Sequence, residues 1–147
     1  MSYWEHIEEA YDKTSIYAGA VMFRREFARL PTRIGDLLAA HWTLSEISNG
    51  GLHQFFSNPT GVLAPEAVQA FDRMGLSEVA QLIRQAMAHF GSSYPRELQE
   101  RELFLGSHGP EFFESLEHRL YEVGSRDLGL IYDVMDLYAT TPKGKEC

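Results

Sequence analysis

The chain has 147 residues, of which 44% are apolar and 23% charged, a composition typical of one folded domain with its own core. Its net charge of −8 disfavours direct binding to nucleic acid, because affinity for phosphate comes from Lys and Arg. The single cysteine, Cys147, excludes an internal disulfide and a cysteine-based metal site. No segment is apolar enough to span a membrane, and the acidic first twelve residues do not resemble a signal peptide, so we expect a cytoplasmic protein.

Apolar side chains recur at three- and four-residue spacing along nearly the whole chain, a period that predicts α-helices. The first helix is expected over residues 3–11 and the second over residues 15–29, with Pro31 following its end. Thr32 is placed to cap a third helix, which runs into a pair of adjacent glycines.

Glycine, proline and serine mark the boundaries of the remaining helices, with Ser77 and Ser125 as caps of two of them. A short helical turn is expected at residues 52–58, and five helices follow it over residues 65–74, 77–90, 94–105, 109–123 and 125–138. We therefore expect an all-α protein with seven to nine helices in a single compact domain over residues 1–140. Residues 141–147 are predicted to form a flexible tail.

One stretch stands apart from the helical pattern, because residues 48–59 combine two adjacent glycines, three carboxamides and two adjacent phenylalanines. We interpret it as a helix end, with a left-handed residue at Asn49 or Gly50. A tight reversal follows near the centre of the domain. Either the carboxamides satisfy backbone groups of a buried bend, or they form the polar wall of a small cleft. The motif residues are Asn49, Gly50, Gly51, Gln54, Phe55, Phe56 and Asn58.

No combination of residues matches a catalytic or metal-binding signature, so neither an enzyme nor a cofactor nor a metal is expected. His41 and His53 flank the glycine pair, with Glu46 between them, but no third ligand follows at a recognisable spacing. We interpret His41, which lies on an apolar helix stripe, as a histidine at the core edge that donates to a backbone carbonyl. One basic cluster is interpreted as pairing with acids of the same chain: Arg24, Arg25, Arg29 and Arg33.

The run Asn49-Gly50-Gly51, then Leu52-His53, Gln54, two aromatics and Asn58, resembles the hallmark of a bacterial family of domains of largely unknown function. The likeness continues into Phe71-Asp72-Arg73-Met74-Gly75 and, more loosely, into the later helices. The best-understood member of this family is a DNA mimic, number nineteen in the mimic series. The resemblance implies an all-helical fold in which the motif is a fold signature. It also implies similarity to a dimeric, acidic protein whose surface carboxylates stand where DNA has phosphates and so cover the DNA-binding face of a transcription factor.

Acid is concentrated in two segments of the chain. Residues 1–12 hold four acids and no Lys or Arg, and residues 96–136 hold ten acids and four arginines. Such segments are either solvated helix faces or a surface that attracts a basic partner. The candidate acidic interaction surface consists of Glu5, Glu8, Glu9, Asp12, Glu97, Glu100, Glu111, Glu114, Glu117 and Glu122.

We expect a non-enzymatic acidic protein-interaction domain, in its sharpest form a DNA mimic that occupies the DNA-binding face of a transcription regulator or another basic protein. Direct contact with nucleic acid or membrane is not expected, and a homodimer is left open. Two alternatives remain: a small-molecule-binding or catalytic domain with a cleft near His53, Gln54 and Asn58, and an immunity- or antitoxin-like partner. Acids in two rows at the spacing of DNA phosphates would favour mimicry, whereas scattered acids paired with arginines would not.

Overall fold

The structure of the protein is a computed structural model that describes residues 2–141, except for the side chains of residues 125 and 127–129. The predicted tail at residues 142–147 lies outside the described residues. The described part consists of seven α-helices and two short 3-10 helices, without a strand, which confirms the predicted all-α fold. None of the helices described is long and apolar enough to cross a bilayer.

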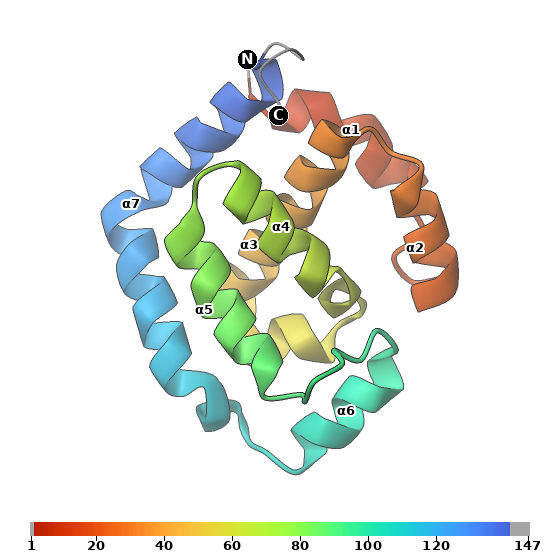
Figure 1. Cartoon of the computed structure of the whole chain (residues 1–147), viewed down its shortest axis with the longest axis vertical. Helices are drawn as coiled ribbons and strands as arrows, with labels where there is room; N and C mark the ends of the chain where they lie inside the picture. Colours follow the sequence, from red (N-terminus) through yellow and green to blue (C-terminus); the bar gives the residue numbers. More distant parts are fainter. Residues whose placement is uncertain (1, 142–147) are drawn as a thin grey trace.

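Figure 1 shows how these elements are arranged. Helix α3 crosses the middle of the molecule with α4 packed against it, and α7 runs along one side for most of the long axis (Figure 1). Helix α1 lies at one end of that axis and α6 at the other. The bounds are α1 Trp4–Lys13, α2 Ala20–Ala28, α3 Thr32–Ser57, η1 Pro59–Leu63, α4 Ala64–Arg73, α5 Ser77–Ala88, α6 Leu98–Gly106, η2 Pro110–Phe113 and α7 Glu114–Thr140.

The core forms where α3, α4 and α5 bury their apolar stripes against one another. Leu38 of α3, Phe71 of α4 and Ile83 of α5 are each fully buried. Burying a side chain of this size contributes roughly 1.5–3 kcal/mol each, so the helical spacing of the apolar residues explains most of the packing. Helices α1, α6 and α7 then cover this centre from the outside.

The second helix and two helix caps differ from the predictions. Helix α2 begins at Ala20 rather than at residue 15, because Gly19 adopts a φ of 95°, which lies outside the helical region. Thr32 and Ser77 are not caps but the first residues of α3 and α5, one position after Pro31 and Leu76.

Helix α6 begins at Leu98, four residues later than predicted. The preceding residues are held by contacts to other elements, since the Tyr94 hydroxyl donates to the Gly61 carbonyl at 2.6 Å. Arg96 pairs with Glu66 of α4 at 2.7 Å. Burial raises the pKa of Tyr94, so its hydroxyl stays protonated as the donor of this bond.

Helix α7 is one continuous helix, without the predicted break at Ser125. Leu120, Ile131 and Met135 are buried along it on both sides of that position. Tertiary packing of this stripe therefore continues the helix past a serine that favours caps in isolation.

Asp36 joins three helices from the interior. It is only 4% exposed, and its carboxylate accepts hydrogen bonds from Arg73 Nε at 2.8 Å and from the Tyr138 hydroxyl at 2.6 Å. The hydrogen bond to Asp36 raises the pKa of Arg73. The buried charge is thus paired and hydrogen-bonded, as a stable interior requires.

His41 links α3 to the start of the chain. Its Nδ1 lies 2.9 Å from the Tyr3 hydroxyl, so its partner is a side chain rather than the predicted backbone carbonyl. Burial lowers the pKa of His41. Burial, together with Tyr132 and Asp136, raises the pKa of Tyr3 to about 12. The Tyr3 backbone N–H donates to Asp136 at 2.6 Å, which fastens α1 to the end of α7.

Candidate functional site: the bend, its supports and the surfaces around it

The predicted reversal is a kink that divides α3 into two helical segments. Gly50 has φ −153° and ψ 15°, and Gly51 has φ 78° and ψ −172°. Gly51 therefore occupies a conformation that other residues adopt only at a cost. The left-handed residue was predicted at Asn49 or Gly50, and it is instead the second glycine of the pair.

A carboxylate from α7 satisfies the backbone at the start of the second segment. Glu117 Oε1 accepts the Leu52 N–H at 2.8 Å and, more weakly, the His53 N–H at 3.5 Å. Such N–H groups have no partner within their own helix. A Cβ on Gly51 would lie 2.6 Å from Glu117 Oε1, so glycine is also needed for this close approach.

Two of the three carboxamides of the motif bind a carboxylate rather than the backbone groups that one of our two interpretations assigned to them. The amides of Gln54 and Asn58 both donate to Glu46 Oε2, at 3.0 Å and 2.8 Å. The side chain of Gln54 lies against Gly50. A Cβ on Gly50 would overlap the amide oxygen of Gln54, which is too close for any other residue. Both amides are half-buried, and they brace the second segment of α3 against the first.

Arg101 of α6 holds the other end of the bend, a role that sequence reasoning missed. Its side chain is fully buried, and burial lowers its pKa. Nε donates to the Phe56 carbonyl and Nη2 to the Asn58 carbonyl, both at 2.9 Å. Nη1 donates to the carbonyls of Pro95 and Arg96, at 3.2 Å and 2.7 Å. A helix C-terminus leaves such carbonyls without partners, and here one guanidinium supplies several donors at once.

The two adjacent phenylalanines of the motif are both completely buried. The ring of Phe56 lies 4.9 Å from that of Phe90 and 5.3 Å from that of Phe113, which are distances of packed aromatic pairs. Neither Phe55 nor Phe56 is therefore exposed to a ligand, and the pair anchors the bend in the core.

The predicted ligand cleft near His53, Gln54 and Asn58 stays a prediction. The amides of Gln54 and Asn58 are occupied by the carboxylate of Glu46, and His53 is half-buried. Among the residues that the structure describes, no three His, Cys, Asp or Glu side chains are grouped so that they could hold a metal ion.

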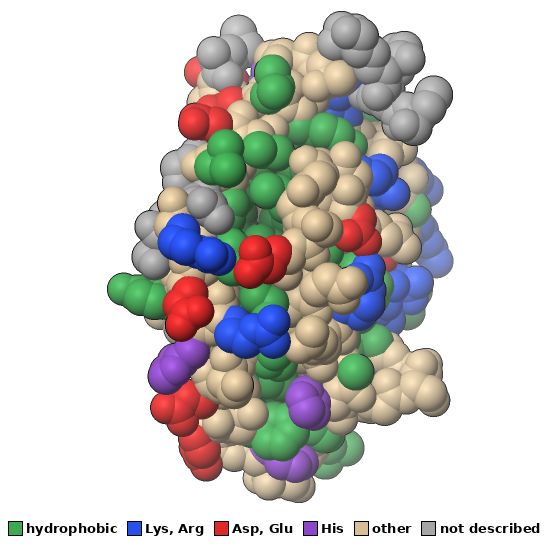
Figure 2. Space-filling model, turned by 60° about the vertical axis from the view of Figure 1, so that its left-hand side comes forward, with side chains coloured by type: hydrophobic (Ala, Val, Ile, Leu, Met, Phe, Trp, Pro, Cys, Tyr) green, Lys and Arg blue, Asp and Glu red, His purple; other side chains and the backbone are tan. Residues whose placement is uncertain are grey.

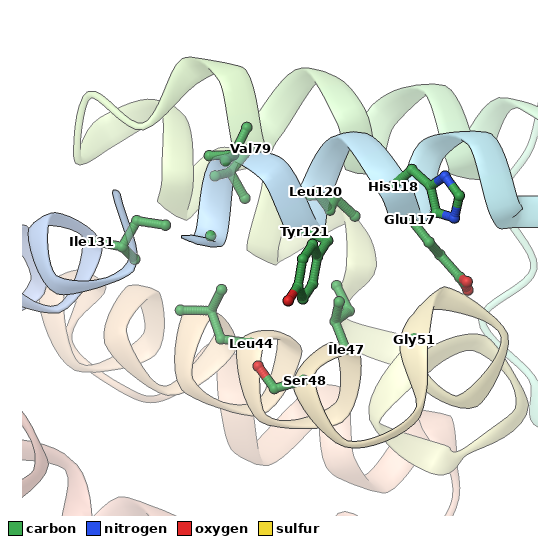
Figure 3. A pocket seen from close by; sticks show the side chains of 12 residues that line it. Leu44, Ile47, Ser48, Gly51, Val79, Glu117, His118, Leu120, Tyr121 and Ile131 are labelled. Carbon is green, nitrogen blue, oxygen red and sulfur yellow. The ribbon is translucent and has the colours of Figure 1, made fainter. Parts of the chain in front are cut away.

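A cleft of about 710 Å³ lies on another side of the bend, between α3 and α7. Figure 3 shows Leu44 and Ile47 rising from α3 and Tyr121 descending from α7 toward Ser48. Gly51 and Glu117 border the same cleft at one end. This volume is within the range of small-molecule sites, and the spacing of α7 from α3 that creates it was not visible in the sequence.

Eight of the ten acids of the predicted interaction surface lie at the two ends of the molecule. The α1 acidic group is Glu5, Glu8, Glu9 and Asp12, and the α6 acidic group is Glu97, Glu100, Glu111 and Glu114. They lie at opposite ends of the long axis (Figure 1). On the face that includes α7, acidic and basic side chains alternate around a band of hydrophobic ones (Figure 2).

The two remaining predicted acids, Glu117 and Glu122, lie on α7 and belong to neither group. Glu117 is half-buried and accepts the Leu52 N–H at the bend, so it stabilises the fold although part of its side chain is exposed. Glu122 is exposed, and its backbone carbonyl accepts a bond from Arg126 at 3.3 Å.

The basic cluster is only partly explained by internal contacts. Arg33 donates to the carbonyls of Ala139 and Thr141 at the end of α7. The other three arginines are exposed, and within the described residues they form no ion pair, so the predicted pairing with acids is not observed for Arg24, Arg25 and Arg29.

These features define an all-helical domain whose central helix is kinked at a glycine pair and braced from α6 and α7. A family model described as "DMP19-like protein" matches residues 28–139, and the chain belongs to this family. The match includes the bend, which confirms the resemblance that the motif indicated. No curated protein and no solved structure matches the chain.

Proposed function

We propose that this chain is a non-enzymatic protein-interaction domain whose acidic groups bind a basic DNA-binding protein in the manner of a DNA mimic. The observation that carries the proposal is the state of the carboxylates at the two ends. Six of them make no ion pair within the described part of the chain: Glu5, Glu8, Asp12, Glu97, Glu100 and Glu111. Membership of the DMP19-like family supports the same function.

The acids elsewhere in the fold behave differently. Asp36, Glu66 and Asp72 each pair with an arginine of a neighbouring element. A carboxylate without such a partner keeps its full charge toward solvent, where it attracts a basic surface and accelerates association with it. The unpaired acids at the ends are therefore the groups that would stand for DNA phosphates.

The separation of the two groups bears on the kind of partner. Because the α1 and α6 acidic groups lie at opposite ends of the long axis, the proposal requires two basic contact patches on the partner rather than one. DNA-binding dimers present two such patches, one for each half-site of their operator. A cytoplasmic DNA-binding protein of this kind is the partner we propose.

The test begins with capture of the partner from the native host at low salt, elution by a salt gradient and identification by mass spectrometry. The captured protein is then titrated with duplex DNA, which a mimic must compete with. Release by DNA supports the proposal. A partner that binds this chain and DNA at the same time contradicts it, and an immunity- or antitoxin-like role would be recognised by a captured toxin.

Paired double variants locate the contact. Glu5→Gln with Glu8→Gln removes two charges from the α1 acidic group, and Asp72→Asn with Glu78→Gln removes two charges from acids that have arginine partners. The change in net charge is the same. We expect weaker partner binding for the first pair only. Equal weakening by both pairs would show that binding depends on the net charge of the chain and not on the α1 acidic group.

A further inference from the structure

The cleft between α3 and α7 has the size and lining of a ligand site. Its volume of about 710 Å³ lies within the range of 300–1,000 Å³ that is typical of small-molecule pockets. Most of its walls are aliphatic, with Leu44 and Ile47 on α3, Val79 on α5 and Ile131 on α7. Apolar walls of this kind favour a ligand with a hydrophobic body.

The polar groups of the cleft are not evenly spread. Figure 3 shows Glu117 and His118 together at the end beside Gly51, whereas Ile131 and Val79 lie toward the opposite end. Ser48 and the Tyr121 hydroxyl lie between them. A ligand that fits this distribution is apolar at one end and polar at the other.

The polar end holds the carboxylate of Glu117 beside His118, whose Nε2 lies 3.9 Å from Glu114 Oε1. Glu117 Oε1 is committed to the N–H groups of the bend, while Oε2 accepts no hydrogen bond from the residues that the structure describes. Glu114 lies one turn earlier on the same helix. Arg119 is two positions from Glu117 and so lies on a different helix face, and it does not line the cleft. Glu117 Oε2 can therefore accept a hydrogen bond from a ligand, and a cationic N–H donor gives the stronger bond to a carboxylate.

We propose that this cleft binds an organic amine with an apolar body, with the ammonium group at Glu117 and the hydrocarbon between Leu44, Ile47 and Ile131. Glu117, the carboxylate of this site, belongs to neither of the two acidic groups proposed above to bind a protein. Bound there, the amine would lie against the carboxylate that caps the bend, between the two helices that form the cleft.

The test is calorimetric titration at pH 7 with n-octylamine, n-octanol and n-octanoate, which share one chain and differ in head group. The amine is protonated at this pH, as lysine is. It is expected to bind saturably at one site, about tenfold more tightly than octanoate, because the carboxylate head meets Glu117. Shortening the amine to hexylamine should weaken binding about fourfold per methylene, the equivalent of about 0.8 kcal/mol for each buried CH₂.

Two variants separate the head from the body. Glu117→Gln keeps an oxygen for the Leu52 N–H but removes the charge, so octylamine should lose about tenfold in affinity while octanol is unchanged. Gly124→Leu adds a side chain that lines the cleft, at a position where nothing lies within 4 Å of a Cβ, and should block every ligand. Because glycine disfavours a helix, the melting temperature of this variant should not fall.

Each remaining outcome counts against the proposal. Absence of saturable octylamine binding, or binding that survives Gly124→Leu, overturns the site. Equal affinity for amine and carboxylate overturns the cationic head group. Retained octanol binding in Glu117→Gln is the expected control, because it shows that the cleft is intact in that variant.

Discussion

The bend of α3 and the acidic ends of the molecule use the same chemical groups in opposite ways. At the bend, the carboxylates of Glu46 and Glu117 each accept two hydrogen bonds from the chain itself. At the ends, acids such as Glu8 and Asp12 are exposed and form no ion pair in the described part of the chain. The motif therefore stabilises the fold, whereas the acidic helices at the ends present carboxylates that have no ion pair in the described part of the chain.

The difference follows from what each region must stabilise. A kink in a buried helix leaves several backbone groups without partners, and each such group costs about 1–3 kcal/mol unless it is bonded. The bend therefore needs Arg101 and Glu117, brought from α6 and α7. A solvated helix face needs no such partners, and its charges remain available for binding.

Replacement of Arg101 should cause the largest loss of stability. Arg101→Met removes the guanidinium donors from the carbonyls of Phe56, Pro95 and Arg96, while the Asn58 carbonyl keeps only the Gly61 N–H, and we expect the free energy of unfolding to fall by about 4 kcal/mol. Arg84→Met is the matched control, because Arg84 is half-exposed and pairs with an exposed acid, Asp72, so the loss should stay below about 1 kcal/mol. Denaturant unfolding measures both, and equal losses would show that Arg101 has no special role at the bend.

The glycine pair provides the next largest effect. Gly51→Ala places a Cβ against Glu117 at a positive φ, and it should cost about 3 kcal/mol. Gly75→Ala has a nearly identical φ of 81° but nothing within 4 Å, so it should cost only about 1 kcal/mol of backbone strain. The excess loss in Gly51→Ala reflects the Glu117 contact together with the extended ψ of −172° at Gly51, and equal losses would mean that neither strains the alanine.

Removal of the brace between the two segments should have a smaller effect. Glu46→Ala takes away the acceptor for the amides of Gln54 and Asn58, which are half-exposed and can turn to water, so we expect a loss of about 1 kcal/mol. Thermal unfolding measures the change. A stabilised variant would instead indicate a carboxylate kept for ligand binding, as in the alternative cleft near His53.

The smallest effect concerns His41 and appears only on acidification. Since burial holds the folded-state pKa of His41 below its ordinary value of 6.5, the unfolded chain binds more protons once the pH falls below 6.5. Above pH 6.5 this histidine is neutral in both states and its contribution is constant. Stability should therefore fall as the pH drops through 6.5 and level off below the folded-state pKa.

The variant His41→Gln isolates this contribution, because an amide can still bond to the Tyr3 hydroxyl but does not titrate. The unfolding free energies of both proteins are compared at pH 7.5 and 5.5. The wild type should lose more stability than the variant. The same loss in both would show that His41 is not the titrating group.

Local patterns in the sequence predicted much of the fold and little of its bracing. The 3.6-residue spacing of apolar residues located the helices, and the glycine pair located the kink. The capping of Leu52 by Glu117 joins residues 65 positions apart, and no local pattern contains it. In the sequence, Arg101 was considered only for its contribution to the charge of residues 96–136. Its position four residues before the buried Leu105 places it on the inward face of α6.

The two surfaces differ in the same respect. The clusters of acid on α1 and around α6 are readable in the sequence, because each is a short segment. The α3–α7 cleft depends on how far one long helix stands from another. Tyr121 and Gly124 line the cleft only because α7 stands at that distance from α3, and the sequence alone does not predict this distance.

We propose that partner binding depends on the unpaired acids and not on the motif, and the affinity of the captured partner at two salt concentrations tests this dependence. Between about 50 and 300 mM salt, the affinity should fall at least about tenfold, since exposed charges are screened beyond about 8–10 Å at physiological ionic strength. Glu5→Gln with Glu8→Gln should weaken binding at low salt and reduce this salt dependence. An affinity that is the same at both salt concentrations, with no effect of the two substitutions, would show that the unpaired acids do not bind the partner.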